Sequence, residues 1–378
     1  MIYFDNGATS YPKPFSVVNA VQRSFCNFCA NPGRGGYKSA MKSAEMIYNA
    51  RSAAANFFNA DTENVVFTSG CTYSLNAAIK GVCRPSSHFV ISDLEHNSVV
   101  RPLEKLKKSG RCDYSVAKVT PDESETVRNF VNAFRKNTVA VICTLSSNVF
   151  GIMPPISKIA REAHKYGILF ILDAAQGAGY LPVDMKKIDA DIICCAGHKG
   201  LFGPMGTGLL ILSNDVNPDT LIEGGTGSNS ESLNQPEYSP DRFESGTPNV
   251  HGIAGLSEGI KFVETAKCEN ILQHENKIIK YIFDELKPYN SIVLYTDFYD
   301  GVPKSPVLSF NIKSKKSEKT AALLAENGIC VRGGLHCAPL AHKKMGTLDI
   351  GTVRITPSWF TDEKDAEFLV NCIKKIAK

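Results

Sequence analysis

Buried apolar runs that alternate with helical segments constrain the fold of this chain most strongly. The runs are "NVVFTSG", "HFVISDLEH", "TVAVICTLSSN", "GILFILDAAQ", "ADIICCAGHK" and "GTGLLILS". Several are apolar on both alternating faces, which is typical of strands that helices cover on both sides of a parallel sheet. Between them lie helical segments such as "PISKIAREAHKYG", where apolar residues recur at helical spacing before a glycine. This alternation predicts an α/β domain with a mainly parallel sheet.

The alternation ends near residue 250, and this change divides the chain. We expect a large α/β domain over residues 15–250. Residues 1–14 and 251–378 are predicted to form a smaller α+β domain, whose segments include "SPVLSFNIK", "KSEKTAALLAENG" and "DEKDAEFLVNCIKKIAK". A length of 378 residues leaves room for both domains.

Charge and composition exclude several classes of function. The net charge of +4 is small for this length and no basic tract occurs, so neither nucleic acid nor a membrane surface is an expected partner. The start "MIYFDNGATSYPKP" does not read as a signal peptide, and no apolar run approaches the roughly 20 residues that span a bilayer. The 12 cysteines are scattered, several of them in apolar strands, which differs from a disulfide scaffold. We therefore expect a cytoplasmic protein.

Polar side chains follow the ends of several predicted strands. They are His96, Asn148, Asp173 with Gln176, and His198 with Lys199. Ligands of open α/β sheets bind beyond the carboxyl ends of the strands, so these residues predict one site. An amine such as Lys199 can form a Schiff base with an aldehyde cofactor, while a carboxylate such as Asp173 keeps a pyridinium nitrogen protonated. Taken singly, Asp173 also fits a helix cap and Lys199 a surface salt bridge.

The phosphate group of such a cofactor needs backbone N–H donors at a helix N-terminus. The stretch "FTSGCTYSLNAAIKG" predicts a strand, a tight turn and a helix, which places Gly70, Cys71 and Thr72 where an anion binds. The same pattern fits a generic strand-to-helix turn. His96 would stack on an aromatic cofactor or cap a helix, and Asn148 would donate to a ring oxygen or form a turn.

Together these motifs resemble those of fold-type I pyridoxal 5'-phosphate enzymes of the class V aminotransferase group, specifically the cysteine desulfurase/selenocysteine lyase family. The resemblance runs through "YFDNGATSYPKP", "FTSGCTYSLN", "LEHNS", "SSNVFG", "DAAQ", "GHKGLFGPMGTG", "FESGTPN" and "VRGGLHCAP". It implies the PLP-dependent transferase fold type I, with a large mainly parallel domain and a smaller α+β domain. It also implies pyridoxal 5'-phosphate as the cofactor and a homodimer with shared active sites.

The resemblance implies a role for each matching position. Lys199 would bond the cofactor aldehyde and move the substrate Cα proton, and Asp173 would hold the pyridine nitrogen. His96 would stack on the ring and assist proton transfers. The remaining implied cofactor contacts come from Gly70, Cys71, Thr72, Asn148, Gln176, His198 and, across the dimer, Thr247 of the partner subunit.

Cys337 decides the reaction that the resemblance implies. L-Cysteine would become L-alanine and leave its sulfur on Cys337 as a persulfide for an acceptor protein, with Arg332 favouring the thiolate. Arg354, in "GTVRITPS", would clamp the substrate carboxylate as a bidentate fork, and Asn148 and Tyr37 would also line the substrate side. The short "RxGxxC" spacing resembles the sulfur-mobilisation branch. In isolation, Cys337 also fits an inert loop cysteine.

Three positions depart from the family pattern. Cys71 replaces a common threonine, and Ala196 replaces a serine that often contacts phosphate. Tyr37, in "NPGRGGYKSA", replaces a histidine typical of the sulfur-mobilisation branch. The first two departures would remove one or two hydrogen bonds to phosphate, each contributing about 0.5–1.5 kcal/mol. The third bears on substrate preference.

Other functions stay open at this point. Selenocysteine lyase demands less of Cys337, because selenium leaves more readily than sulfur; a kynureninase or an isomerase of the same fold needs no positioned thiol. A thiol- or metal-binding sulfur carrier on this fold is the alternative of a different class. For it, "FCNFCA" places Cys26 and Cys29 at C-x-x-C spacing, but no close second Cys/His pair follows. The phenylalanines predict a buried helix face that holds both cysteines.

Overall fold

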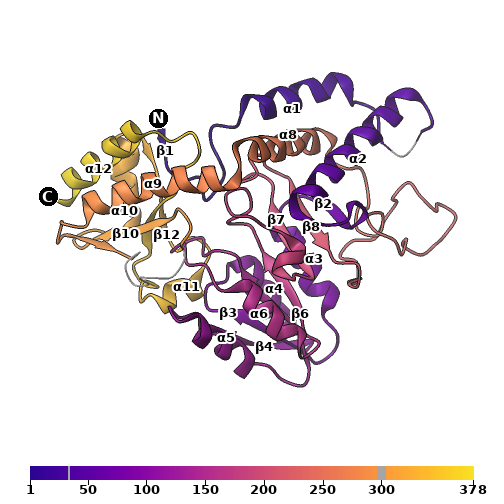
Figure 1. Cartoon of the computed structure of the whole chain (residues 1–378), viewed down its shortest axis with the longest axis horizontal. Helices are drawn as coiled ribbons and strands as arrows, with labels where there is room; N and C mark the ends of the chain where they lie inside the picture. The colour runs from indigo at the N-terminus through magenta and orange to yellow at the C-terminus, as the bar shows by residue number, and fades with distance from the viewer. Residues whose placement is uncertain (33–34, 296–303) are drawn as a thin grey trace.

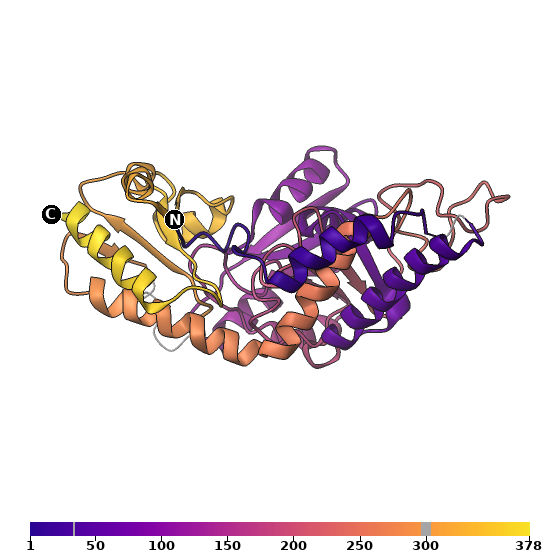
Figure 2. The ribbon, with the colours of Figure 1, turned by 90° about the horizontal axis from the view of Figure 1, so that it is seen from above.

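The computed structural model describes residues 1–32, 35–295 and 304–378. A large lobe and a small lobe lie at opposite ends of the long axis (Figure 1), as the view from above also shows (Figure 2).

The strands are β1 (Ile2–Tyr3), β2 (Val65–Thr68), β3 (Ser87–Ser92), β4 (Cys112–Ala117), β5 (Thr138–Thr144), β6 (Leu169–Asp173), β7 (Ile192–Ala196), β8 (Gly208–Leu212), β9 (Ile292–Leu294), β10 (Leu308–Ile312), β11 (Ile329–Cys330), β12 (Arg332–Gly334) and β13 (Thr352–Ile355). The α-helices are α1 (Phe15–Asn27), α2 (Lys38–Phe58), α3 (Cys71–Val82), α4 (Asn97–Lys108), α5 (Glu123–Asn132), α6 (Ile156–His164), α7 (Met185–Ile188), α8 (Val250–Ala266), α9 (Cys268–Leu286), α10 (Ser317–Glu326), α11 (Pro339–Lys344) and α12 (Glu363–Ala377).

The central sheet of the large lobe confirms the predicted α/β fold. Within the described residues, seven strands form it in the order β2-β8-β7-β6-β5-β3-β4. Strands β3 to β7 pair in parallel, whereas β8 runs antiparallel to β2 and to β7. The register places Asp173 beside Thr144 on one side and Cys194 on the other. The carboxyl ends of these parallel strands therefore meet at one edge of the sheet.

Both faces of this sheet are buried, as the unbroken apolar runs predict. Phe170 and Leu172 pack in one hydrophobic cluster, while Ile171 between them packs in the cluster on the opposite face. Each such side chain contributes about 1.5–3 kcal/mol when it is fully buried. The neighbouring Cys194 and Cys195 also lie on opposite faces, and burial raises the pKa of both thiols well above its ordinary value. These strand cysteines are therefore inert.

The small lobe joins the two ends of the chain. A sheet of order β12-β13-β10-β9 lies beside the parallel pair β1 and β11, in which Ile2 faces Ile329. The indigo N-terminal strand accordingly lies among the orange and yellow C-terminal elements (Figure 1). The division into residues 15–250 and residues 1–14 with 251–378 stays a prediction. Helix α8, just past residue 250, packs against α1 and α2.

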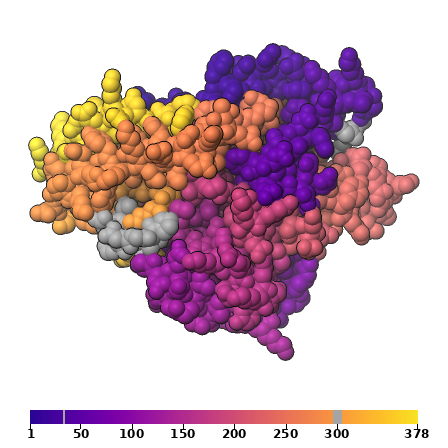
Figure 3. Space-filling model, in the orientation of Figure 1, coloured from indigo at the N-terminus to yellow at the C-terminus, as the bar shows by residue number. Residues whose placement is uncertain are grey.

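The segment that carries the C-x-x-C pattern, with Cys26 in α1 and Cys29 beyond its end, differs from its prediction. Helix α1 buries Val17 and Ser24, but Phe25 is 60% exposed, and Cys26 and Cys29 are exposed as well. The expected buried face with both cysteines is therefore wrong. Phe25 stacks on the ring of His251 in α8 at the surface, so it does not turn its helix face inward. The indigo helices form part of the outer surface (Figure 3).

The described residues lack two features that other classes of protein have. Across residues 1–32, 35–295 and 304–378, no group of three or more His, Cys, Asp or Glu side chains is arranged to hold a metal ion. Of the helices described there, none combines the length and the apolar character that crossing a membrane requires.

Candidate active site

A pocket opens at the carboxyl edge of the central sheet. Its cavity volume is about 230 Å³. Turns after β2, β3, β5, β6 and β7 supply its walls, so residues far apart in sequence meet there. The predicted site residues that line it are Gly70, Cys71, Thr72, His96, Asn148, Asp173, Gln176, His198 and Lys199.

The start of α3 provides the anion-binding corner of this pocket. Gly70 precedes the helix with a φ of 151°, a conformation that glycine adopts readily. Its carbonyl accepts from the N–H groups of Tyr73 and Ser74, which make the first hydrogen bonds of the helix. The N–H groups of Cys71 and Thr72 precede this pattern and are left for other acceptors. Such free donors at a helix N-terminus are suited to a phosphate group.

A second donor set points to an anion at this corner. The Thr72 hydroxyl lies 2.8 Å from the Ser98 hydroxyl. Nδ1 of His198 is buried and has no hydrogen-bond partner among the described residues. A buried polar atom without a partner is costly, and a phosphate oxygen would supply the missing bond. The residues present therefore fit a phosphate-bearing cofactor.

Cys71 turns its thiol away from this corner. The thiol donates to Oδ1 of Asp173 at 3.4 Å and lies 3.3 Å from the Cys194 carbonyl oxygen. Burial, and then the Asp173 charge, raise the pKa of Cys71 well above its ordinary value. Only the backbone of Cys71 is left to contact an anion. The side chain that departs from the family pattern instead contacts the carboxylate at the pocket floor.

Asp173 and Lys199 have the environments that the predicted chemistry needs. Asp173, at the end of β6, is 3% exposed, and its Oδ1 also accepts from the Ala175 N–H at 2.9 Å. Burial lowers the pKa of Lys199, although the negative charge of Asp173 opposes that effect. A lowered pKa favours the neutral amine, which is the nucleophilic form. A carboxylate for a ring nitrogen and an amine for an aldehyde thus line one pocket.

The structure bears out one of the two interpretations of His96 that the sequence left open, and the stacking of His96 on a cofactor stays a prediction. His96 caps α4, because its Nδ1 accepts from the Ser98 N–H at 3.0 Å. This bond leaves the ring proton on Nε2. Burial lowers the pKa of His96 to about 4. His96 is therefore a neutral imidazole that lines the pocket in a fixed orientation.

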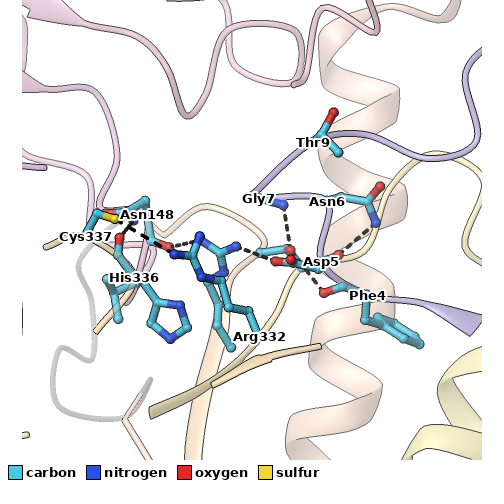
Figure 4. A network of polar contacts seen from close by, with 12 residues as sticks. Phe4, Asp5, Asn6, Gly7, Thr9, Asn148, Arg332, His336 and Cys337 are labelled. Atoms are coloured by element: carbon cyan, nitrogen blue, oxygen red, sulfur yellow. Dashed lines mark hydrogen bonds and ion pairs between the residues drawn. The ribbon is translucent and has the colours of Figure 1, made fainter. Parts of the chain in front are cut away.

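A strained turn holds Cys337 close to residues of the pocket, although Cys337 does not itself line it. His336 and Cys337 have φ values of 49° and 58°, which non-glycine residues seldom adopt. The Asn148 side chain donates to the His336 carbonyl at 2.7 Å, and the Asn97 N–H donates to the Cys337 carbonyl at 2.7 Å. The Cys337 sulfur lies 3.9 Å from Nη2 of Arg332 (Figure 4).

Besides Cys337 and Arg332, three further predicted residues do not line the pocket. Arg354 is 1% exposed; its Nη1 donates to the Asn148 carbonyl at 3.0 Å and its Nη2 to Asp5 at 2.6 Å. Tyr37, before α2, is 56% exposed. Thr247 lies in a neighbouring hollow with Phe67 and Tyr73. One chain thus gathers the cofactor residues but leaves Tyr37 and Thr247 outside.

The structure adds Glu95, a residue that the sequence interpretation missed. This fully buried carboxyl group accepts from the Thr144 N–H at 2.9 Å and from the Ser92 hydroxyl through Oε1. Its Oε2 has no hydrogen-bond partner in the described part of the chain. Burial is the main cause that raises the pKa of Glu95 to about 8, and the Asp173 charge adds to it. The signal that could have identified Glu95 from the sequence is an acidic residue placed between a buried strand and His96.

Known proteins are similar to this chain over its whole length. The family model described as "Aminotransferase class-V" matches residues 2–369. A protein of Methanothermobacter thermautotrophicus named "Probable cysteine desulfurase" is 32% identical, over 100% of this chain and 94% of its own length. A protein of Pyrococcus abyssi with the same name is 31% identical over the same shares. The solved apo structure of a cysteine desulfurase from Thermococcus onnurineus superposes with a TM-score of 0.91 at 28% identity, covering 100% of this chain and 94% of that one.

Proposed function

The chain belongs to the aminotransferase class-V family, and on that premise we propose that it is a pyridoxal 5'-phosphate-dependent cysteine desulfurase. Relatives that match the whole chain carry the name cysteine desulfurase. The reaction would convert L-cysteine to L-alanine and transfer the sulfur to Cys337. The persulfide sulfur would then pass to an acceptor protein.

The pocket residues divide between holding the cofactor and handling the substrate. Lys199 would hold the cofactor aldehyde, Asp173 the ring nitrogen, and Thr72 with His198 the phosphate; His96 and Gln176 would contact the ring. When bound, pyridoxal 5'-phosphate supplies an electron sink for the substrate Cα.

Lys199 and His96 are suited to proton transfer. The lowered pKa of Lys199 makes its amine available to take the Cα proton. His96, neutral and with its proton on Nε2, can donate a hydrogen bond to the reacting groups. The fixed cap that Nδ1 makes on α4 keeps that donor in one orientation.

Cys337 would carry out the sulfur transfer. Its thiolate attacks the substrate sulfur, so an S–S bond forms and the substrate Cβ–S bond breaks. The carbon fragment keeps the electron pair of that bond, takes up a proton and leaves as L-alanine. The enzyme thiol and L-cysteine thereby become the enzyme persulfide and L-alanine, and no external oxidant is required.

One observation carries this proposal. Hydrogen bonds from Asn97 and Asn148 attach the carbonyls of Cys337 and His336 to the pocket wall, with Arg332 beside the sulfur. The neighbour of Asn97 is His96, and Asn148 itself lines the pocket. An inert loop cysteine would need none of these attachments.

Sulfide and alanine production from L-cysteine tests the proposal. The Cys337→Ala variant should lose both products while it keeps the yellow colour of the bound cofactor, and Lys199→Ala should lose that colour. Cys26→Ala, which removes an exposed thiol on α1, is the matched control and should retain activity. Full sulfide production by Cys337→Ala would contradict the assignment. Retained turnover of selenocysteine by that variant would favour a lyase role.

We also propose a homodimer in which Thr247 of the partner subunit reaches the cofactor phosphate. In support, Thr247 lies outside the pocket of its own chain. The N-terminal helices also expose large apolar side chains, with Phe15 82%, Phe25 60% and Met41 62% exposed. A second copy would cover this surface.

A further inference from the structure

The guanidinium of Arg354 is closed to solvent in this structure. It is 1% exposed and is not among the lining residues of the pocket that holds Lys199. Its Nη1 donates to the Asn148 carbonyl and its Nη2 donates to the Asp5 carboxylate, while Nε is buried without a partner among the described residues. A residue that binds a substrate carboxylate as a fork needs two free donors. Asn148 and Asp5 take only two of the five guanidinium N–H donors, but because the guanidinium is buried, a group that covers it must move before a substrate carboxylate can reach two others.

The N-terminal segment makes this closure. Asp5 lies at one edge of the guanidinium, and a Cβ added to Gly7 would lie 2.9 Å from Cζ of Arg354, so the backbone of Gly7 covers the flat face. Gly7 is itself anchored, since its N–H donates to the Thr356 hydroxyl and its carbonyl accepts from Gln176. Figure 4 shows this segment on one side of the network and Asn148, His336 and Cys337 on the other.

Resting on the proposed function, we propose that Asp5 substitutes for the substrate carboxylate on Arg354 and must leave that residue when the substrate binds. Asp5 would then be a specificity-determining residue that sets the affinity for the substrate carboxylate. The segment around Gly7 stays anchored, so only the Asp5 side chain has to turn. Its side chain is 21% exposed, which gives it a route to solvent.

Charge gives the physical reason for this arrangement. A buried guanidinium without a counter-ion is strongly destabilising, so the enzyme without substrate needs an anion at Arg354. When the substrate arrives, two carboxylates on one guanidinium repel each other, and each disfavours the charged form of the other. Asp5 therefore stabilises the empty site and competes with the ligand of the same site. A residue that merely positions Arg354 would have the opposite effect on binding.

The affinity of the holoenzyme for L-alanine tests this proposal. Binding is followed through the absorption of the cofactor, which requires no desulfuration. Asp5→Asn should lower the Kd for L-alanine about tenfold, because it removes a competing charged hydrogen bond. Asp5→Glu, which keeps the charge, should not lower it. The methyl ester of L-alanine has no carboxylate to pair with Arg354, so its Kd should stay the same in Asp5→Asn.

An unchanged or higher Kd for L-alanine in Asp5→Asn would overturn the proposal, and so would an equal gain for the ester. If Asp5→Asn does not fold, the wild-type crystal structure with L-alanine decides. The proposal requires the Asp5–Arg354 ion pair to be broken there; a contact kept at its present 2.6 Å refutes it. If L-cysteine yields no sulfide, only the proposed function fails, because alanine binding is measured separately.

Discussion

Replacing Glu95 by glutamine should make the protein more stable, and increasingly so as the pH rises. Glu95 is fully buried near Asp173, and its Oε2 has no partner in the described residues. Both hydrogen bonds that it receives reach Oε1, from Thr144 and Ser92. Glutamine can accept the same two bonds with its amide oxygen. The variant therefore copies the neutral form of the carboxyl group and cannot ionise.

The size of the effect follows from the pKa. Burial raises the pKa of Glu95 from 4.5 to about 8. An acid whose pKa is raised by folding contributes its full stability below the unfolded value, and that stability is lost as the pH rises towards the folded value. At about 1.36 kcal/mol for each pKa unit, wild type should lose roughly 4 kcal/mol relative to Glu95→Gln between pH 5 and pH 8.

Thermal unfolding of both proteins across this pH range measures the difference. With an unfolding entropy of about 2.1 cal/mol/K per residue, the Tm advantage of Glu95→Gln should be about 5 °C larger at pH 8 than at pH 5. Protein concentration must be equal in all samples, because an oligomer unfolds in a concentration-dependent way. Glu63→Gln, at an exposed carboxylate, is the matched control and should show no such trend. A Tm difference for Glu95→Gln that does not grow with pH would refute the reasoning.

Three further substitutions test the packing of the large lobe and the anion corner. Arg51→Ala should destabilise the fold by about 3–5 kcal/mol in urea unfolding, because it leaves the nearly buried Glu244 without its two-bond partner; a loss near zero would contradict this. Cys71→Ser should leave the Kd for pyridoxal 5'-phosphate nearly unchanged, because the thiol faces Asp173. Thr72→Ala should raise the Kd for the cofactor about tenfold, since it removes a hydrogen bond to the charged phosphate group. A fluorescence titration with pyridoxal 5'-phosphate measures the Kd of both variants. Equal effects of the two substitutions would contradict this division.

The sheet and the pocket floor could be predicted because their signals are local. A buried strand that ends in Asp173, and another followed by His198 and Lys199, carry both the fold and the site in a few residues. Parallel pairing then brings their ends together. Helix α1 shows the limit of such reasoning, since its apolar residues do not reveal whether Phe25 faces the core or the surface.

Contacts between distant segments could not be predicted in this way. The ion pair of Asp5 with Arg354 joins residues 349 positions apart, and the sequence around one residue does not indicate that the other is its partner. The direction of the Cys71 thiol also depends on where β6 and β7 place their ends. For Glu95, the sequence indicates the position at the end of a buried strand. That its Oε2 has no partner among the described residues is seen only in the packed structure.

The pairing of β1 with β11 has a consequence for synthesis of the chain. Ile2 and Tyr3 are synthesised before the large lobe, whereas their partners Ile329 and Cys330 are synthesised after it. At about 5–20 residues per second, the opening strand waits roughly 15–65 s for its neighbour. The nascent large lobe can collapse in that interval while β1 is still unpaired. The small lobe is then completed after the large lobe, when β1 pairs with the newly made β11.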